Sequence, residues 1–144
     1  MGSIPTHSRH WVSVNNDYCV STFGTLGTYT FVEVEFVKTE PPVVRITGEV
    51  DYGNVGEVRT AIEQAITNSP SGLVVDLSAT TYLDSAGVAA IIAAYQQLRR
   101  TNGKLALVIT NKNVRRILDL VRLDVLPGFS IHSELEAAKQ AVSS

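Results

Sequence analysis

The chain has 144 residues, and its 12 Lys and Arg residues against 14 Asp and Glu residues give a formal net charge of -2. This length suits one domain with a single core, and the interspersed charge gives no reason to expect nucleic acid or an acidic membrane as a direct partner. Cys19 is the single cysteine, which excludes an internal disulfide. The longest apolar run, 87–95, is about half of what a membrane span needs, and no signal-peptide pattern is visible, so we expect a soluble cytoplasmic protein.

The first 28 residues are rich in Ser, Thr, Gly and Asn and show no sustained hydrophobic period. We therefore predict a poorly ordered N-terminal extension over residues 1–28, with a short strand around 18–22 as its only regular element. His7 and His10 stand beside Trp11, but no further metal ligand is in register with them. We expect neither a metal site nor a cofactor.

A regular pattern begins at residue 29. Apolar residues alternate over 29–37, which predicts a half-buried strand. Later segments are either apolar β-branched runs or apolar residues at helical spacing, and they are bounded by Pro, Gly and Asn. The strands expected on this basis cover 29–37, 43–49, 73–77, 104–109 and 129–132, and the expected helices cover 54–68, 85–100, 114–121 and 133–142.

The order of these elements is β-β-α-β-α-β-α-β-α, so strands and helices alternate after an opening hairpin. Alternation of this kind favours right-handed crossovers between strands of one sheet. We predict a single α/β domain over 29–144, in which about four helices pack on a mixed central β-sheet.

The junction between the central strand and the next helix holds Asp84 and Ser85. Both residue types cap helix N-termini, so the helix is predicted to begin at one of them, with the backbone N–H groups of residues 86–88 pointing back unpaired. A serine hydroxyl presented there can accept a phosphate, whose charge the helix dipole and the free N–H groups stabilise. The small residues that follow would leave the hydroxyl uncovered. The same spacing also fits two residues that only cap a helix.

Three segments follow one another along the chain: Gly-Glu-Val-Asp at 48–51, Leu-Val-Val-Asp-Leu at 73–77 and Tyr-Leu-Asp-Ser-Ala-Gly at 82–87. Together they resemble the STAS domain of anti-sigma factor antagonists, and the resemblance covers about Val43 to Val142. In that family the serine directly after the aspartate of an Asp-Ser-Ser/Thr-Gly motif is phosphorylated. The resemblance therefore implies that Ser85 is a phosphorylation site, and it implies the STAS architecture.

The resemblance also implies a partner-binding surface, which would consist of Asp51, Asp84, Ser85, Ala86 and Gly87. Asp51 matches the aspartate of the family's Gly-Glu-Leu-Asp motif, which lies near the phosphorylated serine and takes part in recognition by the kinase. The residues alone equally describe Asp51 as a turn residue before a helix. Ala86 departs from the family, where Ser or Thr is usual, and leaves Ser85 as the only hydroxyl acceptor in the motif.

By this resemblance the unphosphorylated protein would bind an anti-sigma factor with an ATP-binding serine-kinase fold and release a sigma factor for transcription. Phosphorylation of Ser85 by that kinase would end the interaction, and a PP2C-type phosphatase would restore it. In this role the protein is a substrate and a ligand, with no catalytic residues of its own.

Two other functions remain open at this point. The same domain could serve as an accessory subunit of a transporter or lipid-transport ATPase, or as a scaffold in a stress-sensing complex. A serine hydrolase would need a base beside Ser85 and a Gly-x-Ser-x-Gly elbow, which the sequence lacks. Only His132 lies within the predicted domain, where we expect it at the end of a strand or on the surface.

Overall fold

The structure is a computed structural model that describes residues 10–15, 18–24 and 31–143. Its strands are β1 (His10–Asn15), β2 (Tyr18–Gly24), β3 (Phe31–Val37), β4 (Val43–Val50), β5 (Gly72–Leu83), β6 (Lys104–Val108) and β7 (Phe129–His132). Its helices are α1 (Val55–Asn68), α2 (Ser85–Arg99), α3 (Lys112–Leu120) and α4 (Leu135–Ser143), with a 3-10 turn, η1 (Leu123–Val125), after α3. From β3 onward the order is the predicted β-β-α-β-α-β-α-β-α.

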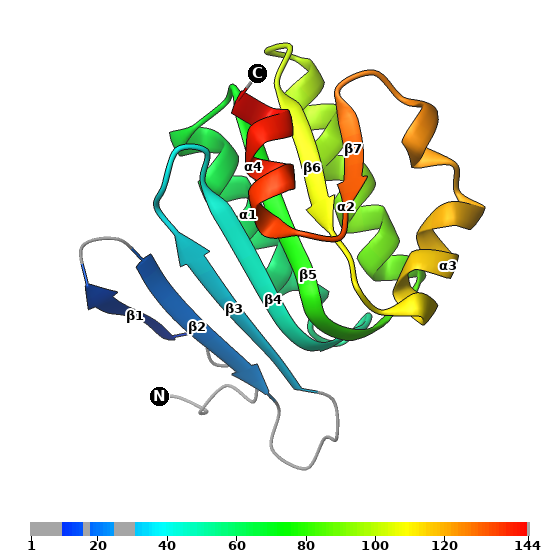
Figure 1. The fold of residues 1–144 in the computed structure, drawn as a ribbon. Helices are drawn as coiled ribbons and strands as arrows, with labels where there is room; N and C mark the ends of the chain where they lie inside the picture. The colour runs from blue at the N-terminus through cyan, green and yellow to red at the C-terminus, as the bar shows by residue number, and fades with distance from the viewer. Residues whose placement is uncertain (1–9, 16–17, 25–30, 144) are drawn as a thin grey trace.

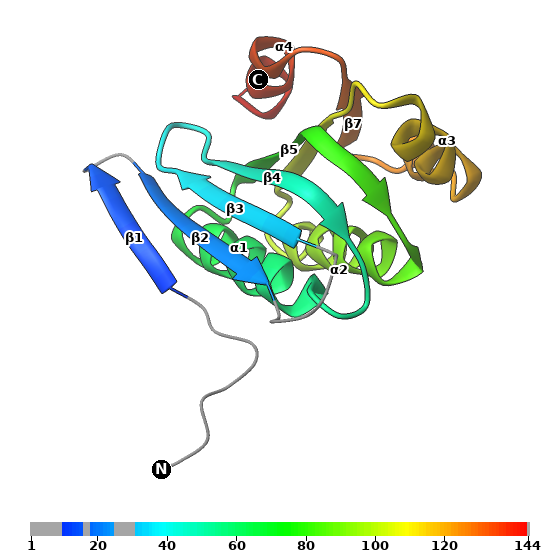
Figure 2. The same cartoon turned by 90° about the horizontal axis from the view of Figure 1, so that it is seen from below.

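The strands form one sheet in which β1 to β7 lie side by side in chain order. Neighbours are antiparallel from β1 to β4 and parallel from β4 to β7, so the prediction of a mixed sheet is confirmed. Figure 1 shows this arrangement, and the view in Figure 2 shows α1 and α2 on one face of the sheet and α4 on the other. Because parallel strands run in one direction, the segments that follow β4, β5 and β6 all emerge at the same edge of the sheet.

Each face of the sheet has its own core. The larger core lies between the sheet and α1 and α2, and Ile62 and Ile91 contribute to it from the helices. The smaller core lies under α4, where Ala138 packs against Val74. The first half of β5 is thus buried from both sides, which explains why it reads as an apolar run, broken only at Asp76, without alternation.

β5 is longer than the strand predicted from the sequence: it continues beyond residue 77 to Leu83. The predicted strand ended at residue 77, so its C-terminal boundary is wrong. The second half of β5 pairs with β4 alone, beyond two irregularities in register, and Val50 lies opposite Leu83. One side of this segment can stay polar because it lies outside the two cores. The Thr80 hydroxyl donates a 2.7 Å hydrogen bond to the Ile46 carbonyl of β4.

Two further strands, β1 and β2, lie within the predicted poorly ordered extension. β2 pairs with β3 along its length and includes the strand suggested at 18–22. Backbone hydrogen bonds hold β1 and β2 in the sheet, and the poor order of the extension over 1–28 stays a prediction. Residues 1–9 and 25–28, with His7 among them, lie outside the described residues. The boundary at residue 28 stays a prediction.

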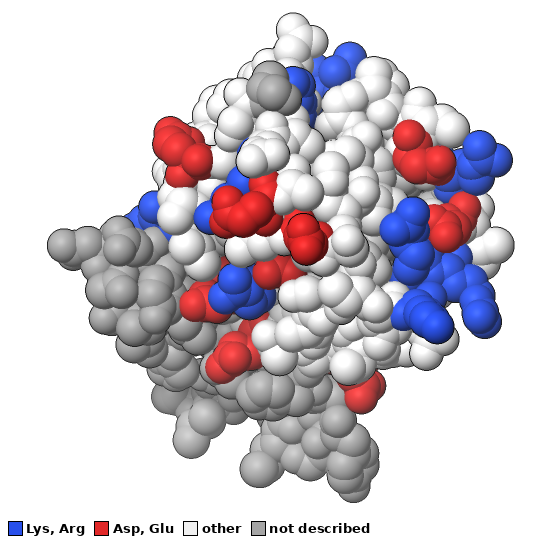
Figure 3. Space-filling view, viewed as in Figure 1, with Lys and Arg blue, Asp and Glu red and all other residues white. Residues whose placement is uncertain are grey.

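Arg45 joins three strands on the α4 side of the sheet. Its guanidinium lies 3.1 Å from the Asp76 carboxylate of β5 and 3.0 Å from the Glu35 carboxylate of β3. Partial burial would lower the pKa of Arg45, but the hydrogen bonds and charges of Asp76 and Glu35 raise it above its ordinary value. Asp76 itself is buried, and Figure 3 shows acidic side chains over this part of the sheet and a group of basic side chains over α3.

Replacing Arg45 with Ala should destabilise the fold by about 1–3 kcal/mol, because it leaves the buried Asp76 carboxylate without its cation. Urea unfolding measures this loss. Arg115→Ala is a matched control, since Arg115 forms an equally short but exposed ion pair with Asp119 that should contribute about 0.5 kcal/mol or less. Equal losses in the two variants would show that the Asp76 charge is stabilised by something other than Arg45.

Candidate functional site

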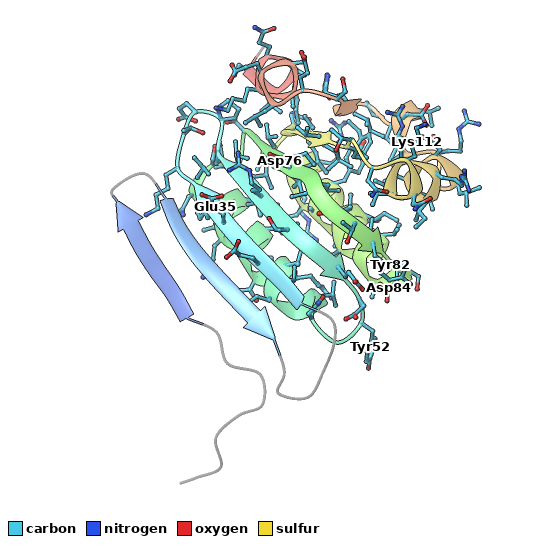
Figure 4. The ribbon with its side chains drawn as sticks, turned by 60° about the horizontal axis from the view of Figure 1, so that its bottom comes forward. Glu35, Tyr52, Asp76, Tyr82, Asp84 and Lys112 are labelled. Carbon is cyan, nitrogen blue, oxygen red and sulfur yellow. The ribbon has the colours of Figure 1, made fainter. Side chains whose placement is uncertain are left out.

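The predicted site residues lie at the edge of the sheet where β4 and β5 end. Val50 and Leu83 are paired as the last residues of these strands, and Asp51 and Asp84 follow them directly. In Figure 4 Asp84 and Tyr52 lie close together at this edge, with Tyr82 beside them on β5. The structure thus brings together two motifs that are more than thirty residues apart in the chain.

Asp84 connects three segments of the chain at this edge. It is the N-cap of α2, and one carboxylate oxygen accepts a 3.1 Å hydrogen bond from the Gly87 N–H. Its other carboxylate oxygen accepts a 3.0 Å bond from the Tyr52 N–H, and its own N–H donates to the Val50 carbonyl. The sequence predicted the cap correctly, but it gave no sign of the bond to Tyr52, which holds the β4–α1 turn against the start of α2.

Asp51 and Asn54 shape that turn by bonding to each other. The Asp51 carboxylate accepts hydrogen bonds from the N–H groups of Gly53 and Asn54, at 2.9 and 3.2 Å. The Asn54 side chain accepts from the Asp51 N–H and donates to the Glu49 carbonyl. Asn54 is the N-cap residue of α1, but its side chain does not cap the helix, because the turn uses it instead.

Ser85 is the first residue of α2 and is exposed. Ala86 is half-buried beside it, and Gly87 is buried. A Cβ on Gly87 would lie 2.4 Å from the Leu83 Cδ1 atom and 3.2 Å from the Val50 Cγ1 atom, so only glycine lets α2 approach the strand ends this closely. The close approach fixes the position of the helix start and leaves the Ser85 hydroxyl facing solvent.

Two exposed tyrosines flank this start of α2. Tyr52 is 86% exposed and Tyr82 is 47% exposed, although large apolar side chains are usually at least partly covered. Tyr82 is part of the motif at 82–87, but neither tyrosine was assigned a role from the sequence. Tyr52 directly follows Asp51 at the end of β4, and this adjacency was the available signal, since a tyrosine just beyond the end of a strand has no core position to fill.

The groups at this edge are suited to accepting a modification and to contacting a protein. The carboxylates of Asp51 and Asp84 are engaged with backbone N–H groups, so neither is positioned as an acid or base for Ser85. His132 ends β7, and its Nε2 atom lies 2.9 Å from the Ser130 hydroxyl. Within the described residues no group of three or more His, Cys, Asp or Glu residues is placed to hold a metal ion, and no helix is long and apolar enough to cross a membrane.

Comparison with known proteins identifies the family. The sequence model of the STAS domain matches residues 33–138, from β3 to the middle of α4. The chain belongs to the STAS domain family. Its predicted membership is confirmed, and the match leaves residues 1–32 and 139–144 outside.

Relatives of this STAS domain are regulators of sigma factors by name. The anti-sigma-F factor antagonist RsfB of Mycobacterium tuberculosis is 32% identical over 100 residues, which are 69% of this chain and 80% of the relative. An anti-sigma F factor antagonist of Paenibacillus polymyxa is 29% identical over 79 residues, 54% of this chain and 68% of that protein. The crystal structure of an anti-sigma factor antagonist from Mycobacterium paratuberculosis superposes with a TM-score of 0.70 at 29% identity, and the match covers 78% of this chain and 95% of that one.

Proposed function

We propose that this STAS domain is an anti-sigma factor antagonist and that phosphorylation of Ser85 switches it off. The names of its relatives support the antagonist role. The observation that carries the switch is the exposed Ser85 hydroxyl at the first position of α2, directly after the Asp84 cap. In the unphosphorylated state the protein binds an anti-sigma factor of the serine-kinase fold and so releases a sigma factor.

The partner-binding surface proposed here centres on the residues predicted from the motif. Asp84 holds the β4–α1 turn beside Ser85, so a partner that contacts Ser85 also meets the turn that carries Asp51 and Tyr52. Asp51 serves recognition through the shape of this turn, because its carboxylate is used by the N–H groups within it. Ala86 and Gly87 carry no large side chain, so nothing bulky projects beside the Ser85 hydroxyl.

The switch requires two enzymes that act on this chain from outside. The kinase-type anti-sigma factor transfers a phosphate to Ser85, and Ala86 leaves it no second hydroxyl within the motif. A PP2C-type phosphatase removes the phosphate. The chain is a substrate and a ligand in this cycle, it works in the cytoplasm, and it needs no cofactor and no nucleic acid.

Affinity purification of the full chain from its own cells tests this proposal. We expect it to recover an ATP-binding anti-sigma factor of the serine-kinase fold, and we expect the Ser85→Ala variant to recover at least as much of it. Recovery of an ABC ATPase or of a transporter instead would establish the accessory-subunit function. Ester hydrolysis by the purified chain, lost in Ser85→Ala, would establish the hydrolase.

A further inference from the structure

Helix α3 carries a group of basic side chains, most of which do not contribute to the stability of the helix itself. Lys112, Arg115 and Arg116 face a single acid, Asp119, within the helix. They lie at its N-terminal half, where the helix dipole disfavours cations. All three are exposed, and Figure 3 shows basic side chains gathered over α3.

Two of these cations have no charge partner. Arg115 pairs with Asp119 at 3.1 Å, whereas Lys112 and Arg116 make no ion pair with any residue that the structure describes. Lys112, Arg116 and Leu120 recur at intervals of four residues, so they share one side of α3, opposite the buried Val114 and Leu118. The connection from β6 and this side of the helix enclose a hollow of about 430 Å³.

The other, C-terminal end of α3 and the η1 turn after it expose apolar side chains. Leu120 is 78% exposed, Val125 is 62% exposed and Val121 is 42% exposed. Unpaired cations together with exposed apolar side chains indicate a site that binds another protein and not a free anion, because a small anion would leave the apolar side chains exposed to water. The positive charges of Lys112 and Arg116 then require that the partner surface opposite them is acidic.

This surface is connected to the site around Ser85 through β5. α3 packs against β5, the strand that ends at Leu83 one residue before the Asp84 cap. Among the described residues, the large apolar side chains that are exposed form just two groups, the two tyrosines beside Ser85 and the three residues at the end of α3 and in η1. In Figure 4 Lys112 lies on the same side of the molecule as Tyr82 and Asp84.

From these observations we infer that the α3 surface, defined by Lys112, Arg116, Leu120, Val121 and Val125, docks an acidic, partly apolar surface of the anti-sigma factor. This inference rests on the proposed function and specifies the chemistry of its partner. Lys112 and Arg116 attract and orient acidic side chains of the partner, and Leu120 supplies an apolar contact at the C-terminal end of α3.

A charge-reversal experiment tests the inference. The anti-sigma factor recovered in the affinity purification is produced separately, and its dissociation constant is measured against wild type at about 0.05 M and 0.3 M salt, between which the screening length of surface charges falls by about half. The test protein carries Lys112→Glu and Arg116→Glu. The control carries Lys38→Glu and Arg100→Glu, which change the net charge equally but lie after β3 and after α2, at the opposite edge of the sheet.

We expect the double reversal on α3 to weaken binding roughly tenfold or more at low salt and to reverse its salt dependence, because salt screens the new repulsion, with an unchanged melting temperature. The control should bind within about twofold of wild type, since its charges lie far from the partner. Leu120→Ser, which changes no charge, should also weaken binding and should fold normally because Leu120 is exposed.

Binding by the α3 variant equal to that of the control would overturn the α3 surface while leaving the proposed function intact. Equal weakening of both proteins would overturn it as well, because net charge and not α3 would then govern affinity. If wild type itself does not bind the anti-sigma factor, the proposed function fails and the α3 surface fails with it.

Discussion

Replacing Ile91 with Ala should destabilise the protein by about 2–5 kcal/mol, the cost of removing a large side chain from a core that cannot close around the gap. Ile91 is only 3% exposed and belongs to the core between the sheet and α2. It lies less than two turns from Ser85, so this packing also holds the start of α2 in place. Urea unfolding monitored by circular dichroism measures the loss.

Ile92→Ala is the matched control, because the same side chain is removed one position further along the same helix. Ile92 packs against this core but is only partly buried, so its truncation should cost clearly less than that of Ile91. A loss below about 1 kcal/mol for Ile91→Ala would contradict the packing of α2 on the sheet.

The fold from β3 onward could be predicted because local chemistry and tertiary structure agree there. Asp84 illustrates this, since it caps α2 both by residue type and in the structure. The second half of β5 could not be predicted, because the Thr80 hydroxyl bonds to a β4 carbonyl that is distant in sequence. β1 was not predicted and β2 was predicted only over 18–22, because their pairing along the sheet leaves no sustained period in the sequence.

The candidate site could be predicted only in part. The motif located Ser85 and Asp51, but the contact that joins them runs from the Asp84 carboxylate to the Tyr52 N–H, and residue types do not reveal a bond to a backbone group. The exposure of Tyr52 likewise depends on where the turn lies in space. The charges of α3 were readable in the sequence, but their lack of partners was not.

Phosphorylation of Ser85 should weaken binding to the anti-sigma factor roughly a hundredfold while leaving the fold intact. A phosphate adds about -1.5 to -2 charges beside the Asp84 carboxylate, and the start of α2 returns about 0.3–2 kcal/mol of stabilisation. Since Ser85 is exposed, the phosphate stays hydrated in the free protein and these effects nearly cancel. The melting temperature should therefore stay close to that of the unmodified protein.

In the complex the same phosphate is pressed against a surface that fits a hydroxyl. At that surface, one like-charge contact with a partner carboxylate at about 5 Å and an effective dielectric constant near 20 costs on the order of 3 kcal/mol. That energy corresponds to roughly a hundredfold in affinity. Ser85→Ala should bind constitutively, and Ser85→Glu should bind weakly while it melts like wild type.

A melting temperature of Ser85→Glu far below that of wild type would show that the hydroxyl is needed to form the start of α2. The loss of binding would then be caused by unfolding. Gln96→Glu is a suitable control for the added charge, since Gln96 is exposed near the other end of α2. It should bind as wild type does.

The central claim is tested most directly by calorimetric titration of the anti-sigma factor with the unmodified chain and with the chain that carries phosphoserine at position 85. The proposed switch predicts tight binding by the unmodified chain and roughly hundredfold weaker binding by the phosphorylated one, with equal melting temperatures. Equal dissociation constants for the two forms would contradict it.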